Sequence, residues 1–292
     1  MRMRYDRSCR ELADYVTGYT VYAVDSKAEQ IDLFLPAPAM INICLDHGPI
    51  AATIGSRRVN PVPQIALYGP STWAMRISTH GGVMVGTGIS APGWSRLFRR
   101  SASEVHNRIV PLADFVGEEM SARLLDALAS LPDDRGIKHA LDMALLDLLG
   151  PPDPYEPVLR ELAAITVGED ILDVAEVGRR LNLTPHQLRA MSRQYFGMTP
   201  KLLLRRARFL RSLLSLSTAG SAAGYEVIDA SYFDASHFLR DAETFLGATP
   251  RRFMAGPTTF FDASIRARAA VLGAGTPALH DPTRIAVPST LT

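Results

Sequence analysis

A seven-residue pattern occurs twice in the second half of the chain, with the copies fifty positions apart. It stands at residues 196–202 (Phe-Gly-Met-Thr-Pro-Lys-Leu) and again at 246–252 (Leu-Gly-Ala-Thr-Pro-Arg-Arg). An internal repeat constrains the fold more than any other feature, because each copy must form the same structural unit. A glycine that ends one helix, followed by Thr-Pro that begins the next, is typical of helix boundaries. The pattern therefore predicts two similar helical units joined by a further helix.

The residues before the first copy predict a supporting helix, a tight turn and a second helix. Val174, Val177 and Leu181 follow one another at helical spacing and form an apolar stripe. After the turn, Thr184 is suited to cap the second helix, and a proline follows it at the first helical position. Gln187 stands three residues after Thr184 and completes a capping-box pattern. The sequence therefore predicts a complete helix-turn-helix unit.

The outward face of that second helix carries the side-chain types that read DNA bases. Glutamine pairs with adenine, arginine pairs with guanine, and a small alanine leaves space for the thymine methyl group. In a recognition helix the N-terminal residues reach the base edges. The predicted base-reading residues of the first unit are His186, Gln187, Arg189, Ala190 and Arg193.

The second unit carries the same features with weaker support. Asp234 is suited to cap its second helix, whose predicted outward residues Ser236, His237 and Arg240 are further candidates for base readout. In its supporting segment glycine and serine replace two of the apolar residues of the first unit, at Gly224 and Ser231. Glycine costs about 1 kcal/mol in a helix relative to alanine, so we expect this unit to be the weaker reader.

The segment between the units is strongly basic. From residue 179 to 225 there are nine Arg or Lys residues and no Asp or Glu. A helix from Pro200 to about residue 216 would be roughly 24 Å long and would bring the units near the ~34 Å that separates successive major grooves. Lys201, Arg205 and Arg208 are predicted to contact phosphates. Residues 171–256 hold 12 basic against 7 acidic residues, while residues 1–170 hold 16 against 21, which indicates one nucleic-acid-facing part.

These segments resemble the AraC-type transcriptional regulators. Residues 174–189 resemble the first helix-turn-helix of that family, 196–200 its inter-unit turn, and 232–241 with 247–250 its second unit. The resemblance covers roughly residues 155 to 256. It implies a bacterial regulator, an activator in many members, that reads two successive major grooves of promoter DNA and works with RNA polymerase.

The N-terminal part reads as short strands separated by turns. Residues 31–35, 40–45 and 83–89 have strand length and composition, and Pro or Gly pairs bound them. The part has a fainter resemblance to cupin-like sensor domains, carried by Leu35-Pro36, Tyr68-Gly69-Pro70 and residues 86–94 and 110–112. Such domains bind a small effector or form homodimers. The resemblance identifies no residue of the effector pocket.

We therefore predict an α+β protein with two domains. Residues 1–112 form a cupin-like β-barrel or sandwich, and 113–150 add a helical extension suited to dimerisation. Prolines at 151–154 break the chain before an all-α DNA-binding domain at 155–256 with two helix-turn-helix units. Residues 257–292 form a tail that we expect to be partly disordered, on composition alone.

Other chemistry has little support in the sequence. The two cysteines form no Cys-x-x-Cys pair and the histidines are scattered, so we expect no metal and no cofactor. Neither a signal peptide nor a membrane-spanning stretch is recognisable, which predicts a cytoplasmic protein that does not bind membranes. We expect no enzymatic activity. Two alternatives stay open: a cupin-type enzyme with an accessory DNA-binding domain, and a protein-interaction regulator whose second helix-turn-helix is degraded.

Overall fold

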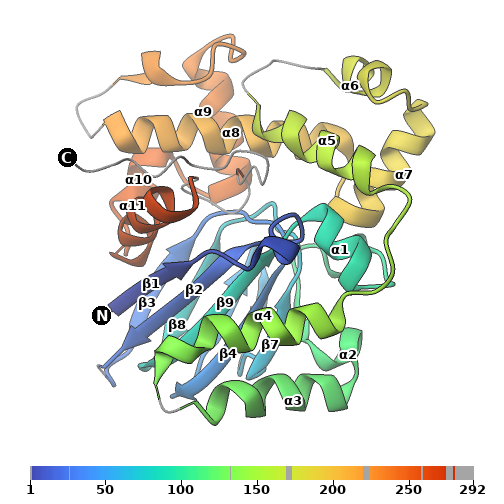
Figure 1. Cartoon of the computed structure of the whole chain (residues 1–292). Helices are drawn as coiled ribbons and strands as arrows, with labels where there is room; N and C mark the ends of the chain where they lie inside the picture. Colours follow the sequence, from blue (N-terminus) through green and yellow to red (C-terminus); the bar gives the residue numbers. More distant parts are fainter. Residues whose placement is uncertain are drawn as a thin grey trace, which may run out of the picture.

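The computed structural model describes residues 2–25, 27–131, 133–168, 173–219, 224–257, 259–273 and 279. Its N-terminal half is built on antiparallel β-sheets, and its C-terminal half is helical. In Figure 1 the helices of the C-terminal half lie above the strands, with α8 running across the molecule. The predicted α+β architecture is confirmed.

The strands form a six-stranded and a four-stranded sheet, and all pairings are antiparallel. The larger sheet has the order β1 (Arg2–Asp6), β2 (Val16–Val24), β9 (Gly82–Ile89), β4 (Met40–His47), β7 (Ile65–Tyr68), β10 (Ile109–Pro111). The smaller sheet has the order β3 (Gln30–Phe34), β8 (Met75–Thr79), β5 (Ala51–Ile54), β6 (Arg57–Val59). The predicted strands correspond to β3, β4 and β9.

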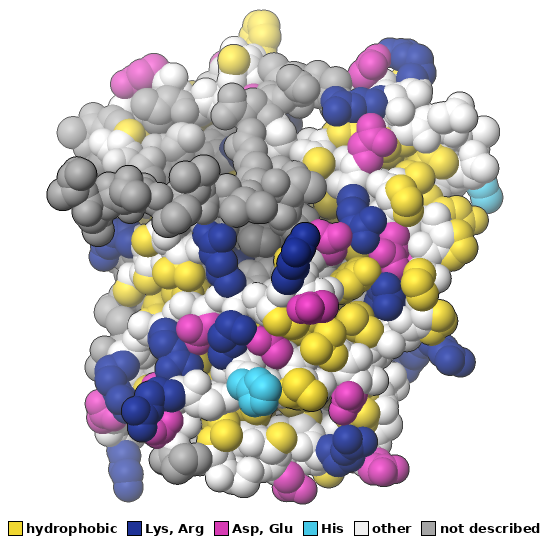
Figure 2. All heavy atoms as spheres, in the orientation of Figure 1, with side chains coloured by type: hydrophobic (Ala, Val, Ile, Leu, Met, Phe, Trp, Pro, Cys, Tyr) yellow, Lys and Arg dark blue, Asp and Glu magenta, His cyan; other side chains and the backbone are white. Residues whose placement is uncertain are grey.

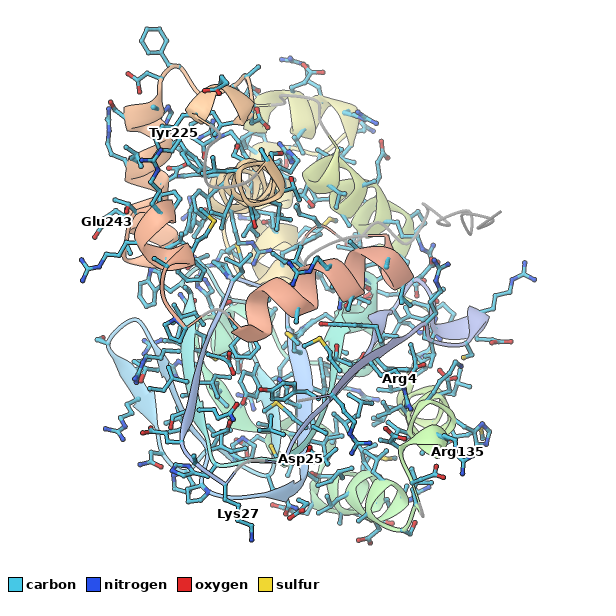
Figure 3. The ribbon with its side chains drawn as sticks, turned by 90° about the vertical axis from the view of Figure 1, so that its left-hand side faces the viewer. Arg4, Asp25, Lys27, Arg135, Tyr225 and Glu243 are labelled. Carbon is cyan, nitrogen blue, oxygen red and sulfur yellow. The ribbon has the colours of Figure 1, made fainter. Side chains whose placement is uncertain are left out.

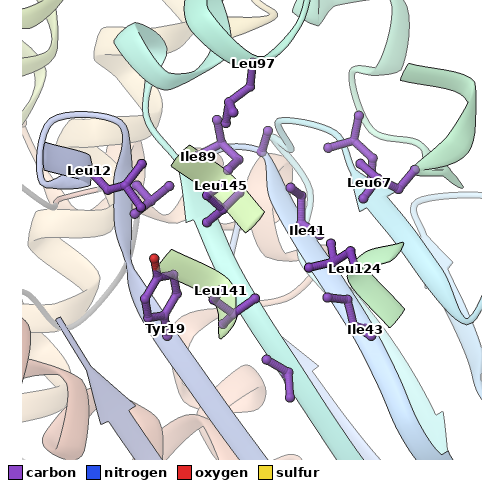
Figure 4. Close-up of a cluster of buried hydrophobic side chains, with 14 of the residues drawn as sticks. Leu12, Tyr19, Ile41, Ile43, Leu67, Ile89, Leu97, Leu124, Leu141 and Leu145 are labelled. Atoms are coloured by element: carbon purple, nitrogen blue, oxygen red, sulfur yellow. The ribbon is translucent and has the colours of Figure 1, made fainter. Parts of the chain in front are cut away.

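Strand β4 shows how the larger sheet serves two cores. Its side chains alternate between the sheet faces. Ile41 and Ile43 pack on one face against Leu124 of α3 (Glu118–Ala129) and Leu141 of α4 (Ile137–Leu148), as Figure 4 shows. Cys44 belongs instead to the core between the sheets. The helices α3 and α4 within residues 113–150, predicted as a helical extension, thus cover the outer face of the larger sheet.

A short helix connects the two halves of the molecule. Helix α1 (Ala91–Leu97) begins where the Ser90 hydroxyl accepts a hydrogen bond from the Gly93 amide at 2.9 Å. It contacts both α5 (Glu156–Val167) and α7 (Pro185–Phe196). The sequence gives no sign of α1, because its seven residues are too few for a periodic signal.

The internal repeat appears as two helices of equal length. Helix α7 and helix α9 (Ala235–Leu246) each have 12 residues and begin fifty positions apart. Each ends at a left-handed glycine, Gly197 with φ 77° and Gly247 with φ 69°. After each glycine a Thr-Pro pair starts the next helix, which is α8 (Pro200–Ala219) or the short α10 (Pro250–Met254).

The two units differ in the element that supports the recognition helix. The first unit has α6 (Val174–Arg180), in which Val177 is fully buried. The second has, within residues 224–234, only the 3-10 turn η4 (Tyr225–Val227). This difference agrees with the weak support expected around Gly224.

The helix that follows the second unit was not predicted. Helix α11 (Thr259–Leu272) occupies part of the segment that we expected to be a partly disordered tail. It contacts β1 and β3, and Figure 3 shows it lying between the strands and the helical part. Ile265 and Arg268 of this helix are buried. The predicted disorder of the last residues falls outside the described residues.

Candidate functional site

The N-terminal half of α7 is exposed to solvent. The capping box forms as predicted: Gln187 N donates to Thr184 Oγ1 at 3.2 Å, and Thr184 N donates to Gln187 Oε1 at 2.9 Å. The five residues predicted to read bases in this unit are all exposed: His186, Gln187, Arg189, Ala190 and Arg193. The structure therefore brings them together on one accessible helix.

Gln187 has a structural role that limits its use in base readout. Its Oε1 atom accepts from both the amide and the hydroxyl of Thr184. Bidentate pairing with adenine needs this same oxygen as an acceptor. Such pairing would therefore require the capping box to open, whereas the side chain of Arg189 has no hydrogen bond or ion pair to another described residue.

The C-terminal half of α7 packs against the strand-rich part at residues 2–112, called the β-domain below. Ser101 donates from Oγ to the Arg193 carbonyl at 3.3 Å, and the Tyr195 hydroxyl donates to Asp153 at 3.2 Å. A side chain at Gly197 would lie 2.9 Å from Pro70, so the backbone approaches the β-domain closely there. The docked end is thus opposite the end at which a recognition helix meets bases.

Helix α9 presents fewer polar groups. Asp234 caps it by accepting from the His237 amide at 2.7 Å, and Ser236 and Arg240 are exposed. The His237 ring is half-buried with its centroid 5.4 Å from that of Tyr232. Phe233, just before the cap, is 94% exposed. The second unit therefore offers two exposed polar candidates and one exposed aromatic side chain.

The C-terminal end of α9 is also in contact with the β-domain. The Ala74 amide donates to the Phe245 carbonyl at 2.7 Å. The two helices predicted to be recognition helices, α7 and α9, are therefore both fixed at the C-terminal end, and both have their capped N-terminal ends exposed.

The arginines predicted to contact phosphates have acidic partners within the protein. Arg205 Nε lies 2.6 Å from Asp241 Oδ1, and Arg208 Nη2 lies 3.4 Å from Asp241 Oδ2. Asp241 is completely buried and also accepts from the Tyr232 hydroxyl at 2.7 Å. The two arginines share this one carboxylate, so Asp241 offsets one of the nine positive charges between residues 179 and 225. Of the three predicted phosphate contacts, Lys201 alone is classed as exposed.

Two further connector arginines are also engaged. Arg211 lies 3.1 Å from Asp229 and donates to the Thr166 carbonyl at 3.0 Å. Arg206 is buried and donates from Nη1 to the carbonyls of Ala37 at 3.0 Å and Ser71 at 2.8 Å. Burial lowers the pKa of Arg206 to about 10, so it is charged at neutral pH. Helix α8 is thereby tied to two loops of the β-domain.

His106 lies close to the Arg206 contact. Its Nε2 atom is 3.3 Å from Thr72 Oγ1. Burial, followed by the positive charges of Arg206 and Arg57, lowers the pKa of His106 to about 4. The imidazole is therefore neutral near pH 7.

A cavity of about 120 Å³ lies between the sheets and is partly closed by α11. That is roughly eight to twelve times the space one water needs, enough for a small organic molecule. Most of its lining is apolar, and Ala37 and Ser71, the residues held by Arg206, belong to it. Neither tryptophan lines it: Trp94 is buried in the core, and Trp73 is 38% exposed. The cavity is the effector-pocket candidate that the sequence did not identify.

Charge on the visible surface is mixed. On the described part of the face in Figure 2, Lys and Arg side chains are interspersed with Asp and Glu side chains. Within the described ranges, no three His, Cys, Asp or Glu side chains are grouped so that they could hold a metal ion. No described helix combines the length and apolar character needed to cross a membrane.

Comparisons with known proteins give only distant similarities. No protein-family model matches the chain, and no curated protein matches it significantly. Among solved structures, ToxT from Vibrio cholerae has 12% identity and a TM-score of 0.45, covering 82% of this chain and 98% of its own. An unsaturated fatty acid-bound ToxT from strain SCE256 has 10% identity and a TM-score of 0.44, covering 81% and 94%.

The AraC-like transcriptional activator CuxR has 10% identity and a TM-score of 0.22, covering 72% of this chain and 85% of its own. Similarities this low do not establish a shared activity.

Proposed function

We propose that the chain is a sequence-specific DNA-binding transcriptional regulator of the AraC type, controlled by a small effector. The observation that carries the proposal is the pair of 12-residue helices, α7 and α9, each with its capped N-terminal end exposed. The 20-residue helix α8 between them is about 30 Å long, close to the ~34 Å between successive major grooves. The sequence resemblance points to the same function independently.

Within this proposal the residues have different roles. Arg189, with His186, Ala190 and Arg193 beside it, reads bases from the first unit, while Gln187 mainly holds the cap. Ser236, His237 and Arg240 meet the second half-site. Lys201 contacts a phosphate, and Arg205 and Arg208 keep the second recognition helix in place.

We infer that effector binding is transmitted through Arg206. This arginine comes from the helix that joins the two DNA-reading units, and its two carbonyl partners belong to residues that line the cavity. A ligand that displaces either loop must change the position of those carbonyls relative to α8. RNA polymerase and a second copy of the chain remain the further partners that we propose.

The degraded-second-unit alternative has one observation in its favour. The second unit has only a 3-10 turn where the first has α6, and Phe233 beside it is 94% exposed. Aromatic side chains are enriched at protein-binding surfaces relative to the rest of a protein surface. The two readings differ in the length of the site: two units protect about two helical turns of DNA, and one unit protects about one.

Selection from a random DNA pool tests the proposal and separates these readings. Purified chain is incubated with random 40-base-pair duplexes, and bound sequences are amplified over several rounds. We expect enrichment of one site about two helical turns long with two conserved half-sites. A site of one turn supports the alternative. A pool that binds but yields no common sequence contradicts sequence-specific regulation.

A further inference from the structure

A guanidinium group lines the apolar cavity without a negative partner among the described residues. Arg268 of α11 is 4% exposed, and it is among the residues that line the cavity. Its Nη2 atom donates to the Thr17 carbonyl at 2.7 Å, while its Nε atom is buried without a hydrogen-bond partner among the described residues. The ring of Tyr5 lies 5.8 Å from the guanidinium carbon. No described Asp or Glu forms an ion pair with this arginine.

A buried guanidinium without a negative partner is unfavourable unless a bound anion pairs with it. Removing an ion from water costs several kcal/mol, and buried charges in proteins are normally paired or hydrogen-bonded at every donor. Burial lowers the pKa of Arg268 to about 10, which still leaves the group charged at neutral pH. The planar guanidinium is the side-chain group best matched to a carboxylate, because it offers parallel N–H donors.

The rest of the cavity determines the body of the ligand. Its wall includes Leu33, Met40, Ile54, Met75 and Ile265, and a ligand there loses water from apolar surface. The Tyr68 hydroxyl also lines the cavity and has no hydrogen-bond partner among the described residues. It is a second donor available to a bound polar group.

We infer that the cavity binds an organic anion with an apolar body, whose carboxylate or equivalent group pairs with Arg268. The inference deepens the proposed function by naming the effector class, and it rests on that function only for the regulatory role of the site. Arg268 lies in the helix that follows the second DNA-reading unit through α10 and Gly256. The ligand would therefore contact a segment connected directly to that unit.

A matched pair of ligands tests the inference. The full chain is titrated by calorimetry at pH 7.5 with benzoate and with benzyl alcohol, which have the same ring, differ in charge and are small enough for a cavity of about 120 Å³. We expect the carboxylate to bind at least about ten-fold more tightly, as for a hydrogen-bonded charge pair. Equal binding of the two compounds, or no binding of either, overturns the inference.

Substitutions identify the responsible residue. Arg268→Gln should reduce the preference for the carboxylate to about two-fold or less, and Arg268→Lys should retain part of it. Arg266→Gln, on the same helix but exposed, is the control and should leave the preference unchanged. An unchanged preference for the carboxylate in Arg268→Gln refutes the assignment. If that variant does not fold, the ratio of the two ligand affinities is compared between Arg268→Lys and wild type, and an identical ratio refutes the assignment. DNA binding is measured on the same samples, so a failure of the DNA-binding proposal is recognised separately.

Discussion

Arg205 of α8 donates from Nε to Asp241 Oδ1 of α9 at 2.6 Å, and Asp241 is completely buried. This contact joins the connecting helix to the second recognition helix. The sequence predicted that Arg205 contacts a DNA phosphate, whereas in the structure its positive charge pairs with Asp241. Some basic residues of the segment 179–225 thus form ion pairs within the protein. Positive charge in the sequence therefore does not by itself identify the residues that contact DNA.

The first prediction separates structural from DNA-contacting cations on one helix. Arg205→Ala leaves Asp241 buried with one partner fewer, so the unfolding free energy should fall by about 2–3 kcal/mol. Lys201→Ala removes an exposed charge and should leave stability within about 0.5 kcal/mol. It should also reduce the slope of log K against log salt by about 0.9. Denaturant unfolding and salt-dependent DNA binding are measured for both. Equal stability of the two variants would show that the ion pair contributes little.

The second prediction concerns two neighbouring residues of α7. Arg189→Ala should cost about 1–3 kcal/mol on the selected DNA site and relax the preference at one or two positions. Gln187→Ala breaks the capping box and should cost about 0.5–1 kcal/mol of protein stability, with a similar relative loss on all DNA sequences. Competition binding and thermal unfolding check both. A changed base preference in Gln187→Ala with unaltered stability would mean that Gln187 reads a base.

The helix boundaries of the repeat and the tertiary contacts of its residues were predictable from the sequence to different degrees. Helix boundaries at Thr184 and Gly197 depend on local chemistry, so the sequence placed them correctly. The Arg205–Asp241 pair joins residues 36 positions apart and depends on how α8 packs on α9. The position of α11 against the sheet is likewise a tertiary contact, and no local pattern reports it. The domain boundaries and the roles of individual DNA-facing residues stay predictions.

The third prediction uses the two equivalent glycines as a matched pair. Both have left-handed backbone, so alanine is strained at either position by about 1 kcal/mol. At Gly247 an added Cβ meets nothing within 4 Å, whereas at Gly197 it would lie 2.9 Å from Pro70 Cγ and 3.1 Å from the Ala102 carbonyl. Gly197→Ala should therefore lose at least about 1 kcal/mol more stability than Gly247→Ala, because it also disturbs the docking of α7. Equal losses would show that the first unit is not held closely against the β-domain in solution.

The fourth prediction concerns His106 and acid. Its pKa of about 4 in the folded protein lies below the value near 6.5 expected after unfolding, so the unfolded chain binds the additional proton. The stability that depends on neutral His106 is therefore complete above about pH 6.5 and is lost as the pH falls towards 4. His106→Gln should reduce the loss of unfolding free energy between pH 6.5 and pH 5 by about 1 kcal/mol. An identical pH profile for wild type and variant would show that the surroundings of His106 do not lower its pKa.

In the function proposed above, two recognition helices of unequal strength read one DNA site. The first unit has the full support of α6 and a capping box, while the second has the 3-10 turn η4. The first should therefore supply most of the base discrimination.

The most direct measurement is a scan of single-base substitutions across the selected two-turn site, read by competition binding with wild type, Arg189→Ala and Arg240→Ala. We predict that single-base substitutions in one half-site each cost about 1–3 kcal/mol of binding free energy. In Arg189→Ala this cost should disappear at one or two positions of that half-site. Arg240→Ala should alter only the other half-site, and by less. A scan with no position above background, or with the stronger discrimination lost in Arg240→Ala, would contradict this account.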